Sequence, residues 1–183
     1  FLGRQLGLTL REDEHHTLDQ TFALLAASAL EQPRVWVHRD YHSRNLMVIE
    51  PDNPGVLDFQ DAVVGAVTYD LVSLLRDCYI AWPRERVEGW ALTHRAALRA
   101  EGMSGLEDEQ QYLRWFDLMG VQRHLKATGI FARLNLRDGK PGYLRDIPRT
   151  LGYVLAVAER YSDLQELRNL LLAHRIERWE PAS

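Results

Sequence analysis

The stretch VHRDYHSRN, residues 37–45, gathers side chains that can carry chemistry: two histidines, two arginines, an aspartate and an asparagine. His38, Asp40 and His42 alternate, and on a strand this spacing places all three on one face. Histidine and carboxylate ligands suit zinc or iron, with Asp58 as a further carboxylate. A zinc site normally has more nitrogen or sulfur ligands, and no second cluster of this kind follows. A metallohydrolase is therefore a rival hypothesis.

The same stretch fits H-R-D-x-x-x-x-N, the pattern of a phosphotransferase catalytic loop. An aspartate at position 40 can accept the proton of an attacking hydroxyl. Asn45 and Asp58 offer the hard oxygen ligands that Mg²⁺ prefers, and Mg²⁺ holds the phosphates of ATP. The simpler interpretations are that Asp40 caps a turn at a strand end and that Asp58 is a buried, hydrogen-bonded carboxylate. Two ordered motifs together favour the phosphotransferase.

Three short strands are expected to position these side chains. They are residues 34–37, 46–50 and 56–59, and PDNPG at 51–55 is strong turn chemistry. The rest of the chain has helical periodicity. Helices are predicted at 17–30, from 70 onward, at 83–100, 108–127, 148–161 and 163–178. The predicted fold class is α+β, mainly α, with short strands around the loop on a helical body.

The run HRDYHSRNLMV…GVLDFQDAVVGAVTYDLVSLLRD resembles the C-terminal lobe of the aminoglycoside phosphotransferase/choline kinase family of kinase-like enzymes. It shares H-x-D-x-H-x-x-N, a strand with D-F, and Y-D-L at a helix start. The longer run, with RDCYIAWP, RWFDLMGVQRHLKATGIFARL, RDGKPGYL and DIPRTLGY, is similar to bacterial anomeric kinases of N-acetylmuramate and N-acetylglucosamine. This resemblance implies an ATP- and Mg²⁺-dependent sugar kinase of cell-wall recycling, with an amino sugar as substrate.

The resemblance also implies roles for individual residues. Asp40 is the catalytic base, and Asn45 and Asp58 are the Mg²⁺ and nucleotide ligands. His42 occupies the second histidine of the family pattern, where it shapes the loop and is a candidate substrate contact. His38 is expected to be structural.

Asp70, in Tyr69-Asp70-Leu71, is expected to brace the catalytic loop, and it is also well placed as a helix N-cap. Two positions depart from related patterns. Gln60 stands where protein kinases have the glycine of D-F-G, which argues against a flipping activation segment. Arg39 replaces a glycine common in the antibiotic-modifying branch, which argues against an antibiotic substrate.

Five further residues are candidates for contacting the acceptor. Three of them are basic: Arg123, His124 and Arg133. They are candidates for lining a pocket that binds the carboxylate of N-acetylmuramate, and a solvated helix face explains them equally well. Arg76 and Asp77 follow the helix start at Asp70 and are candidates for binding a sugar hydroxyl.

A kinase fold needs a glycine-rich phosphate loop and a strand lysine before its catalytic loop. Only 36 residues precede Val37, none of them lysine, and the two lysines of the chain are Lys126 and Lys140. We therefore expect residues 1–183 to be a single C-terminal catalytic lobe. The N-terminal nucleotide-binding lobe is expected to be absent from this chain and to act in cis.

Composition narrows the partners. The chain has 22 basic and 26 acidic residues, for a net charge of −4, and no basic tract, so a nucleic-acid partner is not expected. No apolar run reaches a membrane-spanning length of about 18 residues. Cys78 is the single cysteine, which fits a reducing, cytoplasmic location. The remaining rivals are a kinase of an aminoglycoside, choline or homoserine, and a non-catalytic kinase-like binding module.

Overall fold

The computed structural model describes residues 1–181, and its contacts divide the chain into two units. Unit 1 comprises Phe1–Ala26 and Val121–Ser183, and unit 2 comprises Ala27–Gly120. All the strands found among the described residues lie in unit 2, together with the predicted catalytic loop. The two units are therefore treated separately below.

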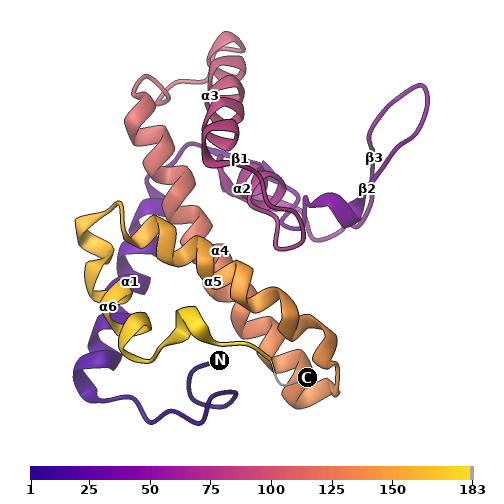
Figure 1. The fold of residues 1–183 in the computed structure, drawn as a ribbon. Helices are drawn as coiled ribbons and strands as arrows, with labels where there is room; N and C mark the ends of the chain where they lie inside the picture. Colours follow the sequence, from indigo (N-terminus) through magenta and orange to yellow (C-terminus); the bar gives the residue numbers. More distant parts are fainter. Residues whose placement is uncertain (182–183) are drawn as a thin grey trace. The chain divides into compact units, whose positions relative to one another are not determined.

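Most of the described chain is helical, as the hydrophobic periodicity predicts (Figure 1). The α-helices are α1 (Glu12–Leu30), α2 (Tyr69–Leu75), α3 (Arg84–Ala100), α4 (Glu109–Asp138), α5 (Ile147–Ala158) and α6 (Gln165–Ala173). Short 3₁₀ turns are η1 (Ser43–Asn45), η2 (Pro141–Asp146), η3 (Ser162–Leu164) and η4 (Ile176–Arg178). A mainly helical fold with a few short strands is thus confirmed.

The strands form two separate antiparallel pairs. β1 (Arg34–Val37) pairs with β4 (Val63–Ala66), and β2 (Leu46–Met47) pairs with β3 (Gly55–Val56). The prediction for β1 is confirmed, but the next two strands are shorter than predicted. β4 was not predicted, because its identity as a strand depends on pairing with β1, about thirty residues away in sequence.

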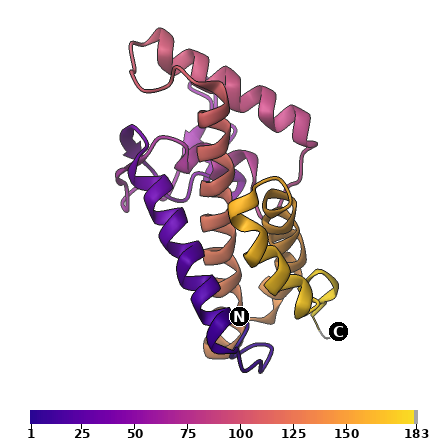
Figure 2. The same ribbon diagram turned by 90° about the vertical axis from the view of Figure 1, so that its left-hand side faces the viewer.

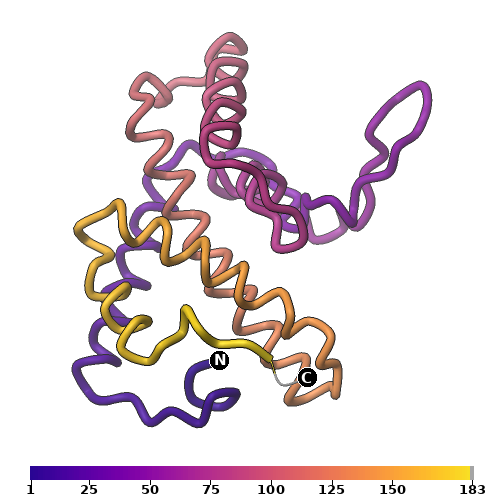
Figure 3. Tube along the Cα trace, in the orientation of Figure 1, coloured from indigo at the N-terminus to yellow at the C-terminus, as the bar shows by residue number. Residues whose placement is uncertain are grey.

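The β2–β3 hairpin reaches away from the other elements of unit 2 (Figure 3). Its apolar side chains do not join a core: Val48 is 92% exposed, and Met47 is 50% exposed. A strand of two residues has few neighbours against which to pack, so the hairpin is held by its own ladder and turn.

The core of unit 2 lies among α2, α3, the first half of α4 and the end of β4. Its buried members are Ala66, Val67, Val72, Leu75, Val87, Ala91, Leu106, Tyr112, Trp115, Phe116 and Met119. A polar contact closes one side of this core, because the Trp115 indole N–H donates to Glu31 Oε1 at 2.6 Å. This core anchors α2, whose start follows β4 after only two residues.

Two arginines of α3 tie it to the chain that follows. Arg84 donates two hydrogen bonds to the buried carboxylate of Asp117, at 2.5 and 2.8 Å. Burial alone lowers the pKa of Arg84, but the hydrogen bonds and charges of Asp117 and Glu88 outweigh it and raise that pKa. Arg95, 4% exposed, donates to the backbone oxygens of Leu106 and Glu107. Both lie in the loop that joins α3 to α4, whose course Figure 2 shows.

Unit 1 is built around α5 and α6. Its deepest apolar residues on these helices are Ile147, Leu151, Val154, Ala158, Leu167 and Leu171. The end of the chain departs from the predicted helix over 163–178, because Arg175 adopts φ 53°, a left-handed conformation that stops α6.

Two other helices are longer than predicted. α1 begins at Glu12 rather than residue 17, and its first turn carries three acidic residues, Glu12, Asp13 and Glu14, which favour a helix N-terminus. α4 continues to Asp138 rather than residue 127, since Gly129 does not interrupt it. Within residues 1–181, no helix combines the length and the apolar character needed to cross a membrane.

Candidate active site

The predicted catalytic loop begins where β1 ends. The Asp70 carboxylate accepts the backbone N–H of His38 at 2.5 Å and that of Arg39 at 3.0 Å. Asp70 lies in the first turn of α2, after the N-cap position at Thr68, and no cap hydrogen bond is made by a side chain there. The expectation that Asp70 caps the helix is therefore wrong, because its oxygens face the loop.

His38 joins the loop to the segment that carries Asp58. Its Nε2 lies 2.8 Å from the Leu57 carbonyl oxygen, and its Nδ1 lies 3.3 Å from the backbone N–H of Asp40. A carbonyl only accepts and a backbone N–H only donates, so this network requires a neutral ring protonated at Nε2. Both ring nitrogens are thus engaged, which leaves neither of them to bind a metal.

Asp40 itself is exposed, and among the described residues its carboxylate has no hydrogen-bond partner. Its backbone is held instead. The Asp40 carbonyl oxygen accepts the His42 N–H at 3.0 Å and the Asn45 side-chain amide at 2.9 Å. A fixed backbone with an open carboxylate suits a group that meets a substrate.

Leu57 places Asp58 beside Asn45. The Leu57 N–H donates to the Asn45 carbonyl oxygen at 3.0 Å, while the Leu57 carbonyl accepts from His38. As a result, Asn45 Nδ2 and Asp58 Oδ2 lie 3.5 Å apart. The predicted meeting of these two side chains is therefore present in unit 2.

The backbone at this site is strained at two positions. Arg39 has φ 78° and Asp58 has φ 65°, both in the left-handed region that non-glycine residues seldom occupy. Such strain concentrates at functional sites, where surrounding contacts hold it in place. Each strained residue follows one whose backbone N–H is hydrogen-bonded: Arg39 follows His38, and Asp58 follows Leu57.

The donor set fits Mg²⁺. Because Asn45 Nδ2 donates to the Asp40 carbonyl, the amide oxygen Oδ1 is the atom of this side chain that could bind an ion. Asp58 adds a carboxylate, and amide and carboxylate oxygens are the ligands that Mg²⁺ takes. In this structure Gln60 Nε2 donates to Asp58 Oδ1 at 2.6 Å, so this amide must move for that oxygen to bind an ion.

The metallohydrolase hypothesis has no support from the arrangement. Within residues 1–181, no group of three or more histidine, cysteine, aspartate or glutamate side chains is placed to hold a metal ion. His42, the third residue of the alternating pattern, packs its ring edge-on against Tyr79 at 5.8 Å, and its Nδ1 is buried without a hydrogen-bond partner.

Asp77 is buried and its carboxylate contacts the catalytic loop. It is a candidate for binding a sugar hydroxyl, and it is 3% exposed and accepts hydrogen bonds from Ser43. This burial favours a structural role for its carboxylate, and its contact with a sugar stays a prediction. Arg76 is the half-buried residue that ends α2, and its role in substrate binding stays a prediction.

The three basic candidates on α4 belong to unit 1. His124 is 3% exposed and stacks on Tyr153 with ring centroids 4.8 Å apart, so it is a packing residue there. Arg123 is half-buried and Arg133 is exposed. That these residues line an acceptor pocket stays a prediction.

A cleft of about 320 Å³ lies beside the loop in unit 2. It is lined by residues of β1, the catalytic loop, α2 and α3, among them Val35, Trp36, Tyr41, Asp70, Leu71 and His94. Burial lowers the pKa of His94, whose Nδ1 lies 2.8 Å from the Tyr112 hydroxyl. Burial also raises the pKa of Tyr112, so this hydroxyl keeps its proton.

Three residues of the site were not foreseen as contacts: Ser43, Gln60 and Tyr79. The only local signal was the small polar Ser43 inside a turn, a position where hydroxyls bond to nearby groups. Its actual partner, Asp77, is 34 residues away in the sequence. Spacing along the chain does not reveal such a pair.

Comparison with known proteins shows the family of the chain. Residues 2–112 match the model of the phosphotransferase enzyme family. An N-acetylmuramate/N-acetylglucosamine kinase of Pseudomonas putida is 50% identical over 93% of this chain and 50% of its own length. A kinase of the same name from Neisseria meningitidis is 46% identical over 94% of this chain and 51% of its own.

The Pseudomonas aeruginosa protein of that name is 48% identical over 93% of this chain and 50% of its own length. The chain thus spans about half the length of the curated relatives it matches. Because the family model covers more than half of residues 1–183 and includes the loop, Asp58 and Asp70, the chain belongs to the phosphotransferase enzyme family.

Proposed function

We propose that this chain is the C-terminal catalytic lobe of an ATP-dependent sugar kinase. The enzyme transfers the γ-phosphate to the anomeric hydroxyl of N-acetylmuramate or N-acetylglucosamine, in the cytoplasmic recycling of peptidoglycan. The observation that carries the proposal is the meeting of Asn45 and Asp58 beside an open Asp40. The names of the relatives support the choice of acceptor.

Each residue has one task in the reaction. Asp40 accepts the proton of the anomeric hydroxyl as that oxygen bonds to the γ-phosphorus, and the bond to the bridging oxygen breaks to release ADP. Asn45 Oδ1 and the Asp58 carboxylate would hold Mg²⁺, and the bound ion would neutralise charge on the phosphates. His38 and Asp70 hold the backbone, so that catalysis rests on positioning and charge.

The proposal includes an N-terminal nucleotide-binding lobe in cis. It is supported by the absence of any lysine before the loop and by relatives about twice as long. The test compares residues 1–183 alone with the full-length protein. We expect the isolated lobe to bind ATP weakly and to turn over little, and a full rate from it would refute this part.

The acceptor is tested by phosphate transfer from Mg-ATP in the full-length protein. N-acetylmuramate, N-acetylglucosamine, glucose, kanamycin and choline are compared, with Asp40→Asn as the inactive variant. Asp19→Asn, at an exposed position of α1, makes the same chemical change away from the site. We expect turnover with the two N-acetylated sugars alone, lost in Asp40→Asn and kept in Asp19→Asn.

Other outcomes are equally informative. Turnover with kanamycin or choline would keep the mechanism and replace the proposed substrate. Nucleotide binding with no transfer to any acceptor would favour a kinase-like binding module instead. Transfer that survives Asp40→Asn at an unchanged rate would remove Asp40 as the base.

A further inference from the structure

Helix α2 carries a carboxylate at each end that faces the catalytic loop. Asp70, in its first turn, binds the backbone where the loop begins, at His38 and Arg39. Asp77 lies two residues beyond the last residue of the helix and binds Ser43, near the end of the loop. The two ends of the loop are therefore held by two carboxylates, one at each end of the same short helix, and that helix packs on the core of unit 2.

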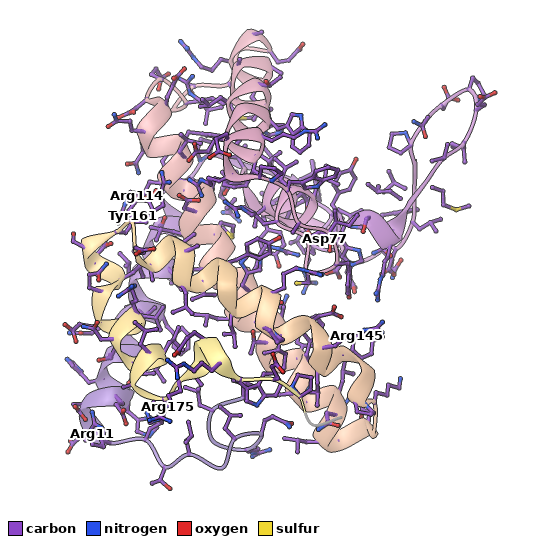
Figure 4. The ribbon with its side chains drawn as sticks, viewed as in Figure 1. Arg11, Asp77, Arg114, Arg145, Tyr161 and Arg175 are labelled. Atoms are coloured by element: carbon purple, nitrogen blue, oxygen red, sulfur yellow. The ribbon has the colours of Figure 1, made fainter. Side chains whose placement is uncertain are left out.

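The Asp77 side chain, labelled in Figure 4, is buried, and both of its carboxylate oxygens accept hydrogen bonds. Its Oδ2 accepts the Ser43 hydroxyl at 2.5 Å and the Ser43 backbone N–H at 3.2 Å. Its Oδ1 accepts the Tyr79 backbone N–H at 2.9 Å. A buried carboxylate needs such donors to offset its loss of water, and here three of them surround it.

Tyr79 extends the same hold to the neighbours of Ser43. The Arg44 guanidinium lies 3.4 Å above the Tyr79 ring, in cation–π geometry. The His42 ring also meets the Tyr79 ring edge-on, with the ring centroids 5.8 Å apart. Asp77 orients Tyr79 through its backbone, so one carboxylate organises contacts to three successive loop residues.

Ser43 is the first residue of turn η1, and Asn45 is the last. The turn is closed by the Asn45 N–H, which donates to the His42 carbonyl oxygen at 2.9 Å. The position of Ser43 therefore determines where the Asn45 amide lies relative to Asp40 and Asp58.

We propose that Asp77 is a positioning residue that fixes turn η1 through Ser43, and thereby sets the Asn45 amide against Asp58. The inference rests on the proposed function for the role of Asn45. It differs from a role of Asp77 in binding the sugar, since within residues 1–181 the hydrogen bonds of its carboxylate go to Ser43 and Tyr79.

Two variants separate the contacts of this carboxylate. Asp77→Asn keeps the shape but has one acceptor oxygen, so an amide N–H₂ must oppose either Ser43 or the Tyr79 N–H. Ser43→Ala is milder, because it removes the hydroxyl and keeps the backbone N–H. Asp19→Asn and Ser104→Ala make the same changes at exposed positions and serve as matched controls.

The first measurement is amide hydrogen exchange in the full-length protein without substrate. We expect Asp77→Asn to speed exchange at residues 43–45 by about tenfold, as a lost buried hydrogen bond does, while His38 and Arg39 stay protected by Asp70. Ser43→Ala gives the same local pattern with a smaller effect. Unchanged exchange at 43–45, or a rise spread evenly over unit 2, would overturn the proposal.

The second measurement is steady-state kinetics with the acceptor found above. We expect Asp77→Asn to lower kcat by about 10- to 100-fold with little change in acceptor KM, as loss of an outer partner of a metal ligand does. The double variant with Ser43→Ala should be no worse than Asp77→Asn alone. A raised KM with unchanged kcat, or additive effects, would assign Asp77 to substrate binding instead.

The two measurements distinguish this inference from the proposed function. Hydrogen exchange reads the loop with no substrate present, so a different acceptor leaves that result intact. Conversely, a confirmed sugar kinase whose η1 exchange is indifferent to Asp77→Asn would keep the function and reject the positioning role.

Discussion

Unit 2 holds two kinds of aspartate around one loop, and they differ in what their oxygens contact. Asp40 and Asp58 are exposed. Asp58 accepts hydrogen bonds from the side-chain amides of Asn45 and Gln60, and the Asp40 carboxylate accepts none within the described residues. Asp70 and Asp77 are partly or wholly buried and bind backbone N–H groups of the loop or its surroundings. The exposed pair lies open to solvent with no backbone N–H partner in the described part of the chain, and the inner pair uses its lone pairs to hold the backbone of the loop and of Tyr79.

This difference predicts that the two kinds respond differently to the same substitution. Aspartate to asparagine removes one charge and one acceptor oxygen wherever it is made. At an exposed position it should change activity and leave stability alone. At an inner position it should change both, because a backbone donor loses its partner.

The largest effect on activity is expected for Asp40→Asn. Loss of a general base lowers kcat by about 10²- to 10⁴-fold, and nucleotide affinity should stay within about twofold. Thermal unfolding should be unchanged, since the Asp40 carboxylate has no hydrogen bond within the described residues. Initial rates and a melting curve test both, with Asp19→Asn as control. A large fall in melting temperature would place Asp40 among the structural aspartates.

Asp70→Asn should lower stability and activity together. It leaves one backbone N–H, of His38 or Arg39, without an acceptor, at a cost of about 2 to 3 kcal/mol. Urea unfolding of the full-length protein, followed by circular dichroism, measures the loss. Full stability with reduced activity would show that the bonds to the loop contribute little to the fold.

Gly65→Ala tests the strand pair that carries the loop. A methyl group at Gly65 would lie 2.8 Å from Val37 Cγ2, and Val37 is buried at the end of β1. Overpacking here should cost about 1 to 2 kcal/mol in urea unfolding. Adding Val37→Ala makes room, so the double variant should be more stable than the two single losses predict. Strict additivity would argue against the register Val37↔Val63.

The smallest effect concerns pH and the core rather than the site. Burial lowers the pKa of His94 below its ordinary 6.5, so the folded chain keeps this ring neutral where the unfolded chain takes up a proton. The stability that follows is present above pH 6.5 and is lost as pH falls through the lowered pKa. The urea concentration at the unfolding midpoint should fall as pH is lowered from 7.5 to 5.5, and it should fall less steeply in His94→Gln than in the unchanged protein. Equal slopes would show that other groups carry the dependence.

The sequence predicted which polar side chains meet better than it predicted the residues that hold them in place. The spacing from His38 to Asn45 and the Asp58-Phe59 pair identified the side chains that meet in unit 2. The burial of Asp77 was not predicted from its place after the helix start, because a carboxylate next to a helix end is polar in the sequence whether it is buried or open. Strand β4 was missed for a related reason, since a short apolar run becomes a strand only when a partner is present.

The sequence by itself determined which residues can do chemistry and where most helices run, because both follow from residue type and local period. Only the tertiary structure decided which aspartates are open and which hold the loop. Asp70 reaches His38 across 32 residues and Asp77 reaches Ser43 across 34. Those hydrogen bonds exist because α2 packs on a core shared with α3 and α4. No local pattern encodes that contact.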